Sequence, residues 1–105
     1  MSDDLPLEAL PFGPALARLM RERGLSYRQL ASRTDLSGGY LNHLVHGARP
    51  VPGNEVIERI ALALDLDPVR FRDYRLRAVW DAIRDRPEVI ERLYAELVRA
   101  PVRQP

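Results

Sequence analysis

Apolar residues recur at the three- and four-residue spacing of helices along most of the chain. One stripe covers residues 12–23, and another covers residues 54–64, where Asn54 is the expected helix cap. A further short helical piece follows, and its Val69 and Phe71 are expected to point back to the same core. The pattern therefore predicts an all-α chain in which several short helices share one core.

Between these stripes, residues 26–47 spell two short helices joined by a tight turn. Ser26 and Gln29 have the spacing of a capping box, in which the two side chains satisfy two free backbone N–H groups reciprocally. Ser37 caps a second helix, which ends at Gly47, where the missing Cβ permits a left-handed conformation. Helices this short are not stable alone, so we expect them to pack against the flanking stripes.

Residues 73–100 continue the helical pattern, with a break in the middle, and predict a helical hairpin followed by a tail at 101–105. The apolar stripe of this hairpin has to be buried. It folds back on its own core, or it meets the same hairpin of a second copy across a two-fold axis. We favour the homodimer, and the hairpin is also a candidate site for another protein partner. The candidate dimer-interface residues are Trp80, Ile90, Leu93, Tyr94 and Leu97.

The formal net charge of +1 is unevenly distributed along the chain. Residues 12–50 carry six arginines against two acids, a net charge of +4. Residues 1–11 carry three acids and two prolines, which predicts a flexible acidic arm. A cluster of positive charge in one part of a chain is the electrostatic pattern expected when DNA is the partner. A solvated surface on a balanced protein explains the charge equally well.

Composition narrows the function classes further. The chain contains no cysteine, so it forms neither a disulfide framework nor a thiolate metal site, and its two histidines are too few for a structural zinc site. No long apolar run or leader segment suggests a membrane protein, and we expect a cytoplasmic, nucleoid-associated protein. The sequence shows no glycine-rich phosphate loop and no nucleophile motif, so we expect neither catalysis nor a cofactor.

Several short segments stand in an order and at spacings that match a known family: Leu-Met-Arg-Glu-Arg-Gly-Leu-Ser at 19–26, Leu-Ala at 30–31, Leu-Ser at 36–37, Tyr-Leu at 40–41, Gly47, Arg49, and Ile-Ala-Leu-Ala-Leu at 60–64. Through these segments, residues 12–72 resemble the Cro and phage-repressor type of helix-turn-helix domain, also called the xenobiotic response element (XRE) family of bacterial regulators. The resemblance implies a five-helix, lambda-repressor-like DNA-binding domain, here with a C-terminal helical extension. It also implies a recognition helix at about Gly38–His46 that enters the major groove of double-stranded DNA.

The start of the recognition helix departs from the family pattern. Relatives commonly carry Gln, Arg or Ser at the positions of Gly38 and Gly39, which have no side chains to present to bases. We therefore expect base readout from Tyr40, Asn42 and His43. Packing of Tyr40 into the domain is the competing role for that residue, and capping of the helix end is the competing role for His46. The residues expected to contact the DNA backbone are Tyr27, Arg28, Gln29, Arg33, Ser37, Gly38, Gly39, His46 and Arg49.

Three functions follow from these observations. The leading hypothesis is a sequence-specific DNA-binding transcriptional regulator that acts as a dimeric repressor. The second is an antitoxin-type or accessory protein, whose hairpin binds another protein while its helix-turn-helix binds DNA. The third is a protein-binding module that keeps the fold without DNA readout, which the Gly38-Gly39 pair favours.

Overall fold

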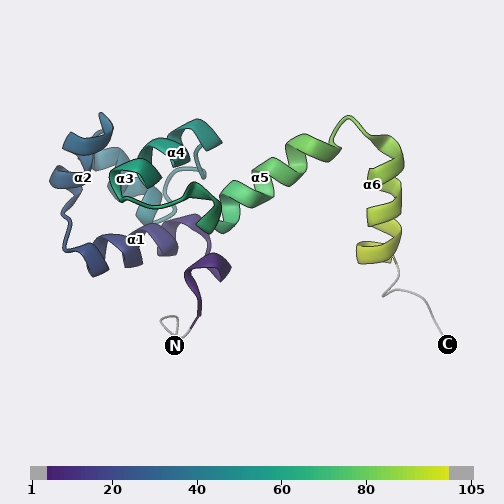
Figure 1. The fold of residues 1–105 in the computed structure, drawn as a ribbon, viewed down its shortest axis with the longest axis horizontal. Helices are drawn as coiled ribbons and strands as arrows, with labels where there is room; N and C mark the ends of the chain where they lie inside the picture. Colours follow the sequence, from purple (N-terminus) through teal and green to yellow (C-terminus); the bar gives the residue numbers. More distant parts are fainter. Residues whose placement is uncertain (1–4, 100–105) are drawn as a thin grey trace.

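The computed structural model describes residues 5–99, which form helices and connecting loops. The prediction of an all-α fold is confirmed. Four helices build the head of the molecule, a fifth leads away from it, and the last lies apart from the head (Figure 1). In chain order, the elements are η2 (Leu7–Ala9), α1 (Phe12–Arg23), α2 (Tyr27–Thr34), α3 (Gly38–Val45), α4 (Asn54–Ala63), η3 (Pro68–Arg70), α5 (Arg72–Ile83), α6 (Pro87–Tyr94) and the π-helical turn η4 (Ala95–Arg99).

One hydrophobic core joins these elements within the head. Phe12, at the start of α1, and Phe71, just before α5, are almost fully buried, and their ring centroids lie 5.0 Å apart. Each fully buried large apolar side chain stabilises the fold by about 1.5–3 kcal/mol relative to exposure. The other large apolar side chains with almost no exposure are Leu16, Leu19, Leu30, Leu41, Ile57, Ile60 and Leu64.

Two details of the predicted apolar pattern are wrong. Val69 is 47% exposed, whereas Phe71 is buried, because the short 3₁₀ turn η3 directs these two side chains differently. Asn54 is the first residue of α4, and Gly53 is its cap. The Asn54 amide instead donates a hydrogen bond to the carbonyl of Tyr74, with a donor–acceptor distance of 3.2 Å. Its side chain therefore links α4 to α5.

Residues 5–11 pack against the head, so the expected flexible arm over residues 1–11 is wrong for this part. Leu7 and Leu10 are each 4% exposed and belong to the core. The acidic residues predicted a segment surrounded by water, but the free energy gained by burying two leucines holds the segment on the head. Residues 1–4 lie outside the described residues.

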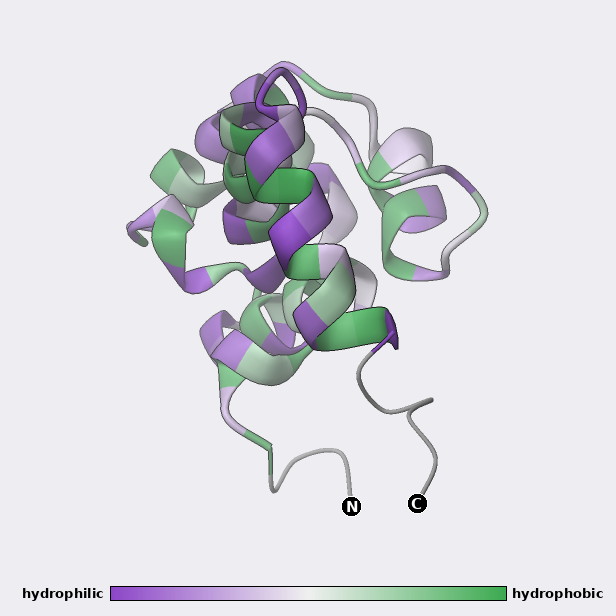
Figure 2. Cartoon of the chain, turned by 90° about the vertical axis from the view of Figure 1, so that its right-hand side faces the viewer, coloured by the Kyte–Doolittle hydropathy of each residue, from purple (hydrophilic) through white to green (hydrophobic). Residues whose placement is uncertain are grey.

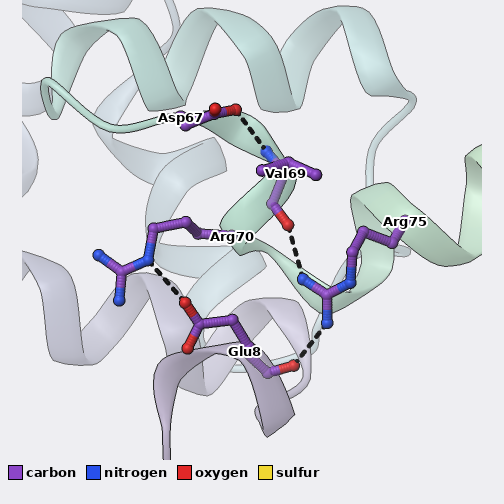
Figure 3. Close-up of polar contacts among 5 residues, drawn as sticks. All are labelled: Glu8, Asp67, Val69, Arg70 and Arg75. Atoms are coloured by element: carbon purple, nitrogen blue, oxygen red, sulfur yellow. Dashed lines mark hydrogen bonds and ion pairs between the residues drawn. The ribbon is translucent and has the colours of Figure 1, made fainter.

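Glu8 anchors the same segment through polar contacts (Figure 3). Its carboxylate accepts a hydrogen bond from Nε of Arg70 at 2.7 Å, and its carbonyl accepts one from Nη2 of Arg75 at 2.9 Å. Arg75 also donates to the carbonyl of Val69 at 2.6 Å. The hydrogen bond from Arg70 is the main cause that lowers the pKa of Glu8 below its ordinary value. One acid therefore joins the start of the described chain to η3 and α5.

The start of α1 is capped by a residue from α5. Pro11 occupies the cap position of α1, and its side chain makes no capping hydrogen bond. The carboxylate of Asp73 accepts a hydrogen bond from the backbone N–H of Phe12 instead, at 2.7 Å. A carboxylate at a helix N-terminus also interacts favourably with the helix dipole. Asp73 thus fixes the first turn of α5 against α1.

Beyond its first turns, α5 leaves the head, and α6 lies at its far end (Figure 1). The radius of gyration is 16.7 Å, whereas a compact domain of this length would have about 13 Å. Within α6 and η4, Val89 is the one buried residue. Figure 2 shows hydrophobic stretches along α6, the helix nearest the viewer. In the single chain, the predicted hairpin therefore leaves most of its apolar stripe uncovered.

Candidate nucleic-acid interface

The first helix of the motif, α2, starts with the predicted capping box, which is confirmed. The Ser26 hydroxyl accepts a hydrogen bond from the backbone N–H of Gln29 at 3.1 Å, and Oε1 of Gln29 accepts one from the backbone N–H of Ser26 at 2.8 Å. This use of the Gln29 oxygen fixes the side chain at the start of α2. Leu30 is the buried apolar residue of this helix.

A three-residue turn, Asp35 to Ser37, joins α2 to α3. Asp35 adopts a left-handed conformation with φ of 60°. The buried hydroxyl of Thr34 donates to the carbonyl of Leu30 at 2.8 Å and accepts from the backbone N–H of Leu36 at 3.3 Å. These contacts fix the direction in which the chain leaves α2. The turn therefore holds α3 at a defined angle to α2.

The second helix of the motif, α3, has the predicted caps at both ends. The Ser37 hydroxyl accepts a hydrogen bond from the backbone N–H of Tyr40 at 3.0 Å. Gly47 follows the helix with φ of 74°, the left-handed conformation expected there. Leu41 and Leu44 are buried, so one face of α3 is fixed to the core.

The start of α1 packs directly against the end of α3. An ideal Cβ added to Gly13 would lie 2.8 Å from the backbone oxygens of both Leu44 and Val45. Real Cβ atoms do not approach backbone this closely, so only glycine permits the observed contact. Sequence reasoning treated Gly13 as part of a helix start and missed this packing role. A glycine in the first turn of a buried helix was the available signal.

The opposite face of α3 carries one exposed stripe at helical spacing: Gly39, Asn42, His43 and His46. Asn42 and His43 are the predicted base readers, and both side chains are exposed. Nothing lies within 4 Å of an ideal Cβ on Gly39, and the nearest atom to one on Gly38 is 3.7 Å away. Packing therefore does not require glycine at either position. The first turn of α3 presents bare backbone at the surface.

Two of the side chains predicted to contact DNA make contacts within the protein. Tyr40 is half-buried against the core, and the guanidinium of Arg49 lies 5.5 Å from the centre of its ring. This distance is in the range of a cation–π interaction. Nδ1 of His46 lies 2.9 Å from the carbonyl oxygen of Asn42, so the ring donates to the end of α3. Both residues therefore have a structural role in the free protein.

The motif and the loop after it carry three exposed arginines. Arg28 and Arg33 lie on α2, and Arg49 follows α3. Within residues 5–99, none of the three forms an ion pair, so their charges are available to an anionic partner. Tyr27 is half-buried beside Gly38, while the backbone candidates Gln29 and Ser37 are exposed residues whose side chains serve as caps. The predicted DNA contacts themselves stay predictions.

Residues 5–99 contain no group of three or more histidine, aspartate or glutamate side chains placed to hold a metal ion. Among the helices of the same residues, none has the length and apolar character needed to cross a bilayer.

Comparison with known proteins identifies the family of this motif. A family profile described as helix-turn-helix domain matches residues 11–74. Searches of the curated proteins and of the solved structures find no match. The matched residues comprise the head from α1 to the first turn of α5 and include the capped pair α2 and α3. The chain therefore belongs to the helix-turn-helix domain family. The helix-turn-helix motif binds DNA by placing its second helix in the major groove.

Proposed function

We propose that the protein is a sequence-specific transcriptional regulator that binds double-stranded DNA as a dimeric repressor, acting on the nucleoid in the cytoplasm. The exposed stripe of α3, together with exposed arginines on α2 and just after α3 that have no ion-pair partner within residues 5–99, is the observation that supports this function. A surface of this kind combines donors and acceptors for base edges with charge for phosphates.

Asn42 and His43 are the proposed base readers. An asparagine pairs with the N6 and N7 positions of adenine, and both side chains extend from the exposed face of α3. Tyr40 contributes its ring edge beside them, while its ring face holds the guanidinium of Arg49. Bare backbone at Gly38 and Gly39 lets the first turn approach DNA closely. Shape and proximity would thus replace the side chains that relatives present there.

The arginines are the proposed phosphate contacts. Arg28 and Arg33 extend from α2, which crosses the DNA backbone in this type of docking, and Arg49 follows the recognition helix. The Tyr40 ring reduces the freedom of the Arg49 side chain, so that less entropy is lost when it binds a phosphate. These contacts would set the position of α3 on the duplex without reading sequence themselves.

Dimer formation completes the proposal. An eight-residue recognition helix with few readers contacts too short a site to be specific alone. Two copies related by a two-fold axis read two half-sites about 34 Å apart, which multiplies specificity. The proposed interface is the apolar stripe of the C-terminal helices, with exposed Trp80, Tyr94 and Leu97 and half-buried Ile90 and Leu93. A dimer bound over a promoter represses by occupying the site that the polymerase needs.

A selection experiment tests this function. Purified protein is mixed with a random duplex pool and excess competitor DNA at physiological salt, and the bound duplexes are sequenced. We expect an inverted repeat, and we expect Asn42→Ala or His43→Ala to lose preference at defined positions of each half-site. Leu62→Ala is the matched control, because Leu62 is exposed on α4, outside the motif. A folded protein that enriches no sequence would refute specific readout.

The protein-binding module is the second candidate, and the bare first turn of α3 favours it. Both glycine positions have room for a side chain and carry none. Reversal of the charges of Arg28 and Arg49 to glutamate distinguishes the candidates. DNA binding should be lost if the arginines contact phosphates, whereas affinity for DNA that is equally weak before and after the change supports the module.

A further inference from the structure

Two neighbouring cavities form an apolar groove on the head, and Val51 lines both. The first has a volume of about 290 Å³ and lies where the start of α1 meets the end of α3. The second has a volume of about 340 Å³ and lies against α5, where Leu76, Arg77 and Trp80 line it. We call these two cavities the Val51 groove. It runs from the end of the recognition helix to the middle of α5.

The C-terminal arm, defined as α6 with η4, has an apolar stripe without a partner in the same chain. Tyr94, Leu97 and Val98 are 50%, 70% and 54% exposed. The arm contacts the far end of α5 and lies apart from helices α1 to α4 (Figure 1). The Val51 groove, along the first two-thirds of α5, and the arm, beyond the end of α5, are therefore two separate uncovered apolar surfaces.

We infer that the arm of one copy occupies the Val51 groove of a second copy, so that two chains exchange arms across a two-fold axis. The inference rests on the dimer of the proposed function and names the surfaces that form it. Exchange places each arm against the partner's α5 and gives an interface in which the same two surfaces meet twice.

The exposed apolar area suits a stable dimer. On the groove side of α5 and on the arm, five large apolar side chains are half or more exposed: Leu76, Trp80, Tyr94, Leu97 and Val98. An aromatic side chain has about 150–250 Å² of surface and an aliphatic one less, so these five, at their exposed fractions, present roughly 500 Å² in one chain. Two copies would bury about 1,000 Å² from these side chains alone, which is the size that a biological interface should reach. Residues around Val51 add to this area.

Cysteine cross-linking tests the inference, because the natural chain contains no cysteine and each introduced thiol is a unique probe. The Val51→Cys and Leu97→Cys variants are prepared separately, mixed so that subunits exchange, and oxidised in the absence of DNA. Both positions are exposed, so neither change removes a core contact. Leu62→Cys, on the exposed side of α4, replaces Val51→Cys in the control mixture. Light scattering gives the oligomeric state of each sample before oxidation.

We expect a dimer, and we expect covalent pairs that contain one Val51→Cys chain and one Leu97→Cys chain. The control mixture should give no such mixed pairs. A dimer in which Leu97→Cys chains cross-link only to each other would show that arm packs on arm, and it would overturn the exchange while leaving the proposed dimer intact. A monomer at micromolar concentration would overturn both the exchange and the dimer. Whichever result the cross-linking gives, the DNA selection experiment tests sequence-specific DNA binding separately.

Discussion

Gly13 and Gly39 are a matched pair of positions for testing how α3 is held in place. Each glycine is the second residue of its helix, Gly13 in α1 and Gly39 in α3. An alanine Cβ at Gly13 would lie 2.8 Å from two backbone oxygens of α3, whereas one at Gly39 has no neighbour within 4 Å. The two alanine substitutions therefore make the same chemical change in opposite steric surroundings.

The expected free energies of unfolding follow from two effects. Alanine is favoured over glycine in a helix interior by up to about 1 kcal/mol, and by less in the first turn. At Gly39 this effect acts alone, so Gly39→Ala should stabilise the protein by about 0.5 kcal/mol. At Gly13 the backbone of α1 or α3 has to move, and overpacking typically costs about 1–3 kcal/mol. Gly13→Ala should therefore destabilise the protein by about 1–2 kcal/mol.

Urea unfolding followed by far-ultraviolet circular dichroism gives the free energy of unfolding of both variants and of the natural protein. In a thermal scan of a domain of this size, the destabilisation expected for Gly13→Ala lowers the melting temperature by roughly 4–15 °C. Equal stability of Gly13→Ala and Gly39→Ala would refute the reasoning, because it would mean that the contact of α1 with α3 is not as close as described. Part of any loss of DNA affinity in Gly13→Ala comes from the larger unfolded fraction. A loss greater than that fraction explains would show that the contact of α1 with α3 also orients α3.

Three further predictions concern the DNA face and the contacts that join the ends of the chain. Arg28→Gln should weaken binding to all DNA sequences and reduce the slope of log affinity against log salt by about one. Fluorescence anisotropy over a salt series measures this, Arg84→Gln is the control, and an unchanged slope would argue against a phosphate contact. Glu8→Gln should lower stability at pH 7, because Arg70 depresses the folded pKa of Glu8; this stabilisation exists above the ordinary pKa of 4.5 and disappears as the pH falls through the folded value. The urea midpoints of variant and natural protein should therefore differ more at pH 7 than at pH 3. Equal midpoints at pH 7 would contradict the role of the Arg70 contact. Asp73→Ala removes the cap of α1 and should cost about 1–2 kcal/mol of unfolding free energy, whereas Asp81→Ala on the exposed side of α5 should cost almost nothing.

The sequence by itself determined the local structure of the motif. The capping box of Ser26 and Gln29, the cap at Ser37 and the left-handed Gly47 all connect residues within a few positions of one another. Interactions of this range depend on helix geometry alone, so their spacing predicts them. The exposure of Asn42 followed in the same way from its place beside buried Leu41. Recognition of the helix-turn-helix family rests on these local features.

Local patterns gave only alternatives for several side chains of the candidate site. The sequence left Tyr40 between packing and readout, and the structure places its ring against the core with Arg49 on one face. His46 was left between a phosphate contact and a helix cap, and its ring bonds the end of α3. The same residue types suit both roles, because each presents a polar tip on a largely apolar body.

Only the tertiary structure decided how the ends of the chain are arranged. Glu8 meets Arg70, and Phe12 meets Asp73, across more than sixty residues in each case. Composition predicted a flexible arm over residues 1–11, but burial of Leu7 and Leu10 depends on a surface that forms only when distant helices pack together. For the same reason, the apolar stripe around Leu97 indicates that this face has to be buried, but the sequence does not identify the surface that covers it. The direction in which α5 leaves the head leaves that stripe uncovered within the chain, because the placement of whole helices is set by packing between residues far apart in the sequence.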